Sequence, residues 1–91
     1  MTQEKIIAAI EAKIGDTDHR IWRIGITDDP ERTRHYWSDT ERKKTFFWTH
    51  WQADSLTGAH QIKSHFVTAK GVKEGMEGNQ REESGPYVYL F

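Results

Sequence analysis

The chain has no cysteine and only two prolines among its 91 residues. The absence of cysteine excludes a disulfide framework, a thiolate metal site and a cysteine nucleophile. No apolar run is long enough to span a membrane, and the start of the chain does not resemble a signal peptide, because Glu4, Lys5 and Glu11 interrupt its apolar residues. We therefore expect a soluble cytoplasmic protein.

An excess of one charge sign is also missing, because the formal net charge is −1. Free-standing nucleic-acid-binding domains usually carry a basic excess, so any such function must depend on a local patch. Residues 32–51 provide one, with Arg32, Arg34, Lys43 and Lys44 among its cations, whereas residues 74–83 are mainly acidic.

Aromatic residues are abundant, with four Trp, four Phe and three Tyr. They bury large areas each, so a chain of this length can form one domain over residues 1–91 with a small core of few, large side chains. We expect Trp22, Phe46, Phe47 and Trp48 in that core. Trp37 is a candidate exposed aromatic beside basic residues, an arrangement on which single-stranded nucleic acid stacks.

The apolar pattern predicts the element order α-β-α-β-α-β. The expected helices cover residues 2–14, 28 to about 37 and 55 to about 70, the expected strands cover 20–26, 45–53 and 86–91, and loops cover 38–44 and 71–85. This pattern indicates a small α+β domain in which helices pack against a three-stranded, mostly antiparallel sheet. Aromatic residues on both faces of 45–53 favour a central place for that strand. The strand order stays open.

The junction from Trp22 to Arg32 is the most informative segment of the chain. An apolar strand breaks at Gly25, and a helix start follows in which an aspartate can cap the first turn and Pro30 suits it. Gly25 is compatible with two roles, a turn glycine with a permissive backbone or a glycine that lines a site. Residues 25–32 resemble the second half of the GIY-YIG nuclease signature, in which a strand ending in Tyr-Ile-Gly leads through a Thr-containing turn into a helix that carries an arginine.

The resemblance implies a nuclease scaffold without its catalytic groups. Members of that family cut DNA phosphodiesters: a tyrosine hydroxyl helps to activate water, an arginine stabilises phosphate charge, and a glutamate holds a divalent metal. At the matching positions this chain has Arg23 for the tyrosine, Thr33 for the arginine, and Gln61 or His60 for the glutamate.

The Gly-Ile-Tyr half of the signature is missing from its usual place before residue 22. The segment Gly85-Pro86-Tyr87-Val88-Tyr89 is similar to it at the opposite end of the chain. We hypothesise that the C-terminal strand occupies that position in the sheet, as in a circular permutation. The hypothesis predicts that residues 86–91 lie beside residues 20–26.

Three functions remain compatible with these residues. The first is a degenerate GIY-YIG-like domain that binds nucleic acid, or a nucleic-acid-processing complex, without cleaving it. Its candidate contacts are Arg23, Arg32, Arg34, Lys43, Lys44 and Trp37. Arginine can bind phosphate through charge-assisted hydrogen bonds, although salt bridges with Asp28, Asp29 or Glu31 are a competing role for these arginines.

The second function is a small, phage-like inhibitor or adaptor that binds a protein through its aromatic and charged surface. The third is an active endonuclease with a rearranged site. That enzyme would need Mg²⁺ and would use Tyr87, Tyr89, Arg32, Arg34 and His35. Apart from this case we expect no cofactor and no metal ligands, and the oligomeric state stays open.

Overall fold

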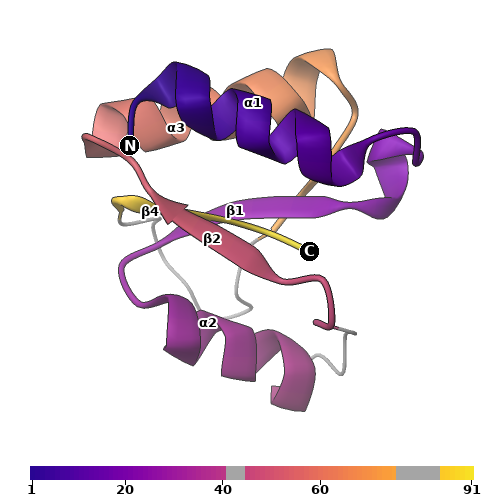
Figure 1. Cartoon of the computed structure of the whole chain (residues 1–91). Helices are drawn as coiled ribbons and strands as arrows, with labels where there is room; N and C mark the ends of the chain where they lie inside the picture. The colour runs from indigo at the N-terminus through magenta and orange to yellow at the C-terminus, as the bar shows by residue number, and fades with distance from the viewer. Residues whose placement is uncertain (41–44, 76–84) are drawn as a thin grey trace.

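The computed structural model describes residues 1–40, 45–75 and 85–91. Within these residues the fold is a small α+β domain in which three helices lie on two sides of a four-stranded mixed sheet (Figure 1). Helices α1 (Gln3–Ile14) and α3 (Leu56–Ser64) cover one face, and α2 (Pro30–His35) lies against the other. The predicted α+β class is therefore confirmed, with one more strand than expected.

The sheet consists of β1 (Arg23–Thr27), β2 (Thr49–Gln52), β3 (Lys73–Glu74) and β4 (Tyr87–Leu90), in the order β2-β4-β1-β3. Strand β4 is antiparallel to both β1 and β2, whereas β3 is parallel to β1. Two expectations were wrong. Strand β2 lies at an edge of the sheet and not at its centre, and the expected loop over 71–85 contains the short strand β3.

Helix α1 follows from local signals in the sequence. The Thr2 side chain accepts a hydrogen bond from the Lys5 backbone N–H at 3.3 Å, and the helix ends at Gly15, whose φ of 55° favours glycine. Ile6, Ile10 and Ile14, spaced four residues apart, are all buried. The predicted span of 2–14 is thus confirmed, with Thr2 as the cap.

The main core lies between the sheet and the helix pair α1 and α3. Alternate residues of the two central strands point toward these helices. The strand residues of this core are Ile24, Ile26, Val88 and Leu90, and α3 and the turn after it contribute Ala59, Ile62 and Phe66. The expected apolar stripe of α3 is confirmed at these three positions, whereas Leu56 and Ala69 are exposed.

The expectation that Phe46 and Phe47 pack in the core was wrong, because these side chains are 82% and 68% exposed. They lie in a turn closed by a hydrogen bond from the Trp48 N–H to the Thr45 carbonyl at 3.1 Å, and the strand begins only at Thr49. Trp22 is buried as expected, and Trp48 is half-buried. The chain therefore presents two adjacent phenylalanines to solvent.

Candidate functional site

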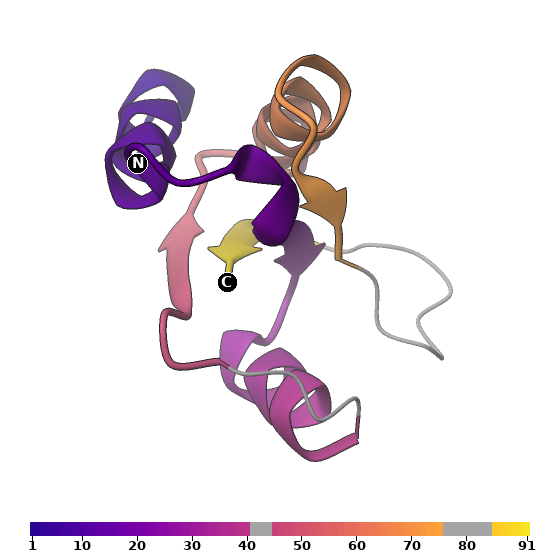
Figure 2. The same cartoon turned by 90° about the vertical axis from the view of Figure 1, so that its right-hand side faces the viewer.

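The two segments that resemble the nuclease signature are neighbours in the sheet. Strand β4 pairs with β1 so that Tyr89 lies opposite Gly25 and Tyr87 lies opposite Thr27. Figure 2, which looks along the sheet, shows the two strands side by side at its centre. The adjacency that the permutation hypothesis requires is therefore present.

Position 25 requires glycine because a larger residue lacks space there, and not because the backbone has an unusual conformation. It lies within β1, and its φ is not among the positive values that favour glycine. A Cβ at this position would overlap the hydroxyl and ring of Tyr89, and it would lie 2.6 Å from the Gly75 carbonyl oxygen. Of the two roles expected for Gly25, the turn role does not apply, because the glycine lies inside a strand and beneath an aromatic ring.

Tyr89 is part of an aromatic cluster on the α2 side of the sheet. Its side chain is 1% exposed, its ring stacks on Trp48 with centroids 4.8 Å apart, and its hydroxyl accepts a hydrogen bond from Trp37 Nε1 at 3.2 Å. Phe91 packs on both tryptophans. A hydroxyl enclosed in this way is poorly placed to activate water.

Trp37 and Arg23 form a second layer of the same cluster. Trp37 is only 3% exposed, so its ring is not an open platform for a base. The Arg23 guanidinium carbon lies 5.0 Å from the centre of the Trp37 ring, a cation–π contact that accounts for a charge within an apolar strand. The expectation that Trp37 is exposed was therefore wrong, and the predicted contact residue over its ring is the half-buried Arg23.

Thr33, at the position of the family's helix arginine, is turned into the protein. Its Oγ1 lies 2.6 Å from the Oγ1 of Thr27, and both side chains are fully buried. Thr27 also accepts a hydrogen bond from the Asp29 N–H at 3.0 Å, so the same hydroxyl organises the turn into α2. The Thr33 side chain therefore joins α2 to β1 inside the protein.

The two flanking arginines differ in their surroundings. Arg32 pairs with Asp28 at 3.1 Å and approaches Asp29 at 3.9 Å, which is the competing salt-bridge role. Arg34 is exposed and forms no ion pair within the part of the chain that the structure describes. Of the predicted cations on this helix, Arg34 is the better candidate for a phosphate contact.

The remaining predicted site residues do not extend this group. His35 is exposed, and its Nδ1 lies 3.6 Å from an Asp39 carboxylate oxygen. Tyr87 is half-buried beside the ring of His50, with centroids 6.0 Å apart. Lys43 and Lys44 lie outside the described residues.

Among the described residues, the candidates for the metal position lie apart from the predicted arginines. His60 and Gln61, the candidates for the metal position, are exposed on α3, across the sheet from the arginines of α2 (Figure 1). Among residues 1–40, 45–75 and 85–91, no three His, Cys, Asp or Glu side chains are grouped so that they could hold a metal ion.

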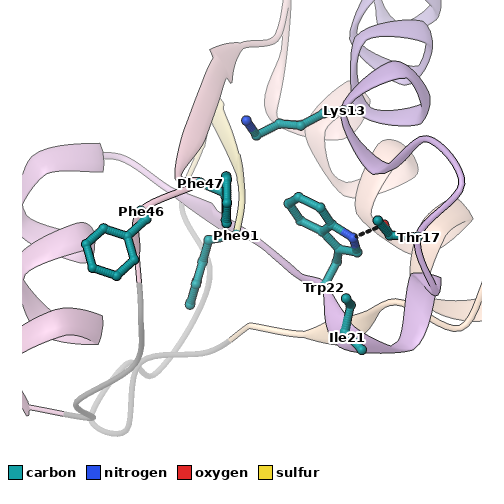
Figure 3. A pocket seen from close by; sticks show the side chains of 7 residues that line it. All are labelled: Lys13, Thr17, Ile21, Trp22, Phe46, Phe47 and Phe91. Atoms are coloured by element: carbon teal, nitrogen blue, oxygen red, sulfur yellow. Dashed lines mark hydrogen bonds between the residues drawn. The ribbon is translucent and has the colours of Figure 1, made fainter.

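A second candidate surface lies where the end of α1, the start of β1 and the turn before β2 meet. A pocket of about 480 Å³ opens there (Figure 3). It is lined by Lys13, Thr17, Ile21, Trp22, Phe46, Phe47 and Phe91. Ile21, which is 67% exposed, is a third exposed apolar side chain of this lining.

Sequence reasoning missed this pocket because it assigned Phe46 and Phe47 to a strand. The signal that was available is that adjacent residues of a strand point to opposite faces, so two neighbouring phenylalanines cannot both enter one core layer. The start of β1 was also expected at residue 20, whereas residues 19–21 form a 3₁₀ turn that leaves Ile21 exposed.

That 3₁₀ turn is fixed by Asp18. Its carboxylate accepts hydrogen bonds from the backbone N–H of Arg20 at 2.9 Å and from the Arg20 guanidinium at 2.8 Å. These bonds, the guanidinium one foremost, lower the pKa of Asp18 to about 2. The turn leads into Trp22, whose Nε1 donates to Thr17 Oγ1 at 2.7 Å, so the indole ring is held as a wall of the pocket.

None of the described helices combines the length and apolar composition needed to cross a membrane. Comparison with protein-family models, with curated proteins and with solved structures found no match to this chain.

Proposed function

We propose that this chain is a non-cleaving binding module that acts on a protein partner, and that the apolar pocket is its contact surface. The observation that carries the proposal is the exposure of Phe46 and Phe47 at a pocket that the exposed Ile21 also lines. Adjacent large apolar side chains left in solvent are typical of interaction sites, and aromatic residues provide much of the binding energy at interfaces.

The absence of cleavage is supported by what occupies the nuclease-like positions. Thr33 packs against Thr27, Tyr89 is enclosed by aromatic rings, and the candidate metal positions of α3 lie across the sheet. We propose that the scaffold is a degenerate, circularly permuted relative of the GIY-YIG fold, for which the pairing of β4 with β1 is the supporting feature. The proposed compartment is the cytoplasm, with which a chain lacking cysteine is compatible.

Nucleic acid is the second candidate partner. The exposed Arg34, without an ion pair among the described residues, is the observation that favours it. An arginine in this state can bind phosphate, and such binding weakens steeply as salt rises. The contact surface would then be α2 and not the pocket.

Affinity capture with three baits separates the two candidates. Wild type, the double variant Phe46→Ser with Phe47→Ser, and Arg34→Ala are used side by side, and captured proteins are identified and retested in purified form. We expect a partner that binds wild type and Arg34→Ala but not the double variant. The serine substitutions are in exposed side chains, so circular dichroism should show an unchanged fold.

The opposite pattern would reject the proposal. A partner that the double variant retains does not use the pocket. Binding of DNA or RNA that weakens steeply with salt and falls on Arg34→Ala would instead establish the second candidate.

A further inference from the structure

We infer that the pocket binds an acidic, apolar segment of the partner protein: an aromatic or branched side chain enters it, and a neighbouring carboxylate pairs with Lys13. The inference rests on the proposed function. The size of the pocket, about 480 Å³, lies within the range of pockets that enclose small ligands, and it admits an aromatic side chain together with adjacent atoms.

The walls of the pocket are apolar rings. The centroids of Trp22 and Phe47 are 6.4 Å apart and tilted by 58°, and Phe91 completes the wall below them (Figure 3). The polar atom of Trp22 is already bonded to Thr17, so the indole offers only its ring to a ligand. Such walls favour an apolar occupant that stacks against them.

Lys13 gives the pocket its charge preference. Its side chain extends from α1 along the rim, as Figure 3 shows. It makes no ion pair with any of the described residues, and the lining residues include no Asp or Glu. The Thr17 hydroxyl, the other polar group of the lining, is bonded to the indole of Trp22 and to the Ile14 carbonyl. Lys13, without an ion pair among the described residues and beside an apolar pocket, is complementary to a ligand that supplies both an apolar group and a negative charge.

A second copy of this chain is a poorer occupant. A two-fold contact uses the same patch on both copies, so it would bring two Lys13 ammonium groups to one interface. The lining includes no Asp or Glu side chain to compensate them. Self-association is nevertheless an outcome that the test detects.

The test uses two synthetic peptides, acetyl-Glu-Phe-Leu-Glu-amide and its neutral analogue acetyl-Gln-Phe-Leu-Gln-amide. Each is titrated at low salt into ¹⁵N-labelled protein while the indole N–H resonance of Trp22 is followed. We expect both peptides to shift this resonance and the acidic one to bind roughly two- to five-fold more tightly, the range for an exposed ion pair. Lys13→Met should abolish the difference, whereas Lys5→Met, a matched change on the same helix, should preserve it.

Several outcomes would overturn the inference. Equal affinities of the two peptides for wild type would show that Lys13 does not select a carboxylate. Chemical-shift changes confined to residues outside the pocket would show that the peptides bind elsewhere. Dimerisation of the free protein that Phe47→Ser abolishes, seen by sedimentation, would assign the surface to a second copy. The proposed function is tested separately, by whether the double variant Phe46→Ser with Phe47→Ser fails to capture the partner protein. If it fails to do so, the proposed function stands even where either peptide result rejects the inference, so failure of the inference and failure of the proposed function can be told apart.

Discussion

Replacing Gly25 by alanine should lower the free energy of unfolding by about 3 kcal/mol, the upper part of the range for overpacked cores. The added methyl group meets two obstacles that cannot move cheaply. Tyr89 is held by its stacking on Trp48 and by the hydrogen bond from Trp37. The Gly75 carbonyl, 2.6 Å from the methyl group, belongs to a residue whose N–H is bonded to the Ile24 carbonyl.

The loss is measured by chemical and thermal denaturation. In a domain of this size, 3 kcal/mol corresponds to a decrease in Tm of roughly 10–25 °C. Gly58→Ala is the matched control, because its methyl group would meet only the Ser55 hydroxyl at 3.2 Å and the Gln3 side chain at 4.0 Å. Its stability should change by about 1 kcal/mol or less, since helix propensity favours alanine.

A double-mutant cycle tests the cause. Tyr89→Leu removes the ring that the methyl group would strike, so Gly25→Ala should cost at least about 1 kcal/mol less in that background than in wild type. Unchanged stability of Gly25→Ala together with lost binding of a partner would refute the reasoning and would make Gly25 a residue that lines a site.

Three further outcomes follow from the structure. Glu74→Gln removes the carboxylate that lies 3.0 Å from the mostly buried Lys63 ammonium and should lower the free energy of unfolding, measured with urea, by about 1 kcal/mol. This value is smaller than that for a fully buried pair because Glu74 is partly exposed. The contact with Arg20 lowers the pKa of Asp18, so it stabilises the fold at pH values above the ordinary aspartate pKa of about 3.9, and this contribution is lost as pH falls through about 2. The difference in Tm between wild type and Asp18→Asn should therefore narrow from pH 6 to pH 2. Plasmid and single-stranded DNA should stay intact with Mg²⁺ or Mn²⁺, and cleavage that purified Tyr87→Phe or Arg34→Ala protein lacks would contradict the non-cleaving assignment.

The helices could be predicted from the sequence because their signals are local. Thr2, Asp29 and Ser55 each cap a helix. In each case the side chain accepts the expected hydrogen bond from the backbone N–H three residues later. Both α2 and α3 continue as π-helical turns, over Tyr36–Thr40 and His65–Ala69, so the predicted end near residue 70 agrees with the structure, whereas the predicted end near residue 37 is too early. Periodicity alone does not distinguish such turns from the helix before them.

The arrangement of the sheet depends on contacts that are distant in sequence. Strand propensity identified residues 45–53, but it could not show that the chain first makes a turn at Phe46 and Phe47 and then pairs at one edge only. Spacing from Gly25 placed Thr33 at the family's arginine position, yet only the structure shows that this side of α2 faces Thr27. Which side of a helix is buried was not readable there, because α2 is too short for a strong apolar period.

One aromatic network contributes both to the positions that match the nuclease signature and to the pocket. Phe91 belongs to both parts of this network. Its ring packs on Trp37 and Trp48 of the cluster around Tyr89, and it also lines the pocket opposite Trp22. Its backbone is fixed by two hydrogen bonds with Arg23, from the Arg23 N–H at 2.6 Å and to the Arg23 carbonyl at 3.0 Å. The packing that encloses the Tyr89 ring therefore also positions Phe91 as a wall of the pocket.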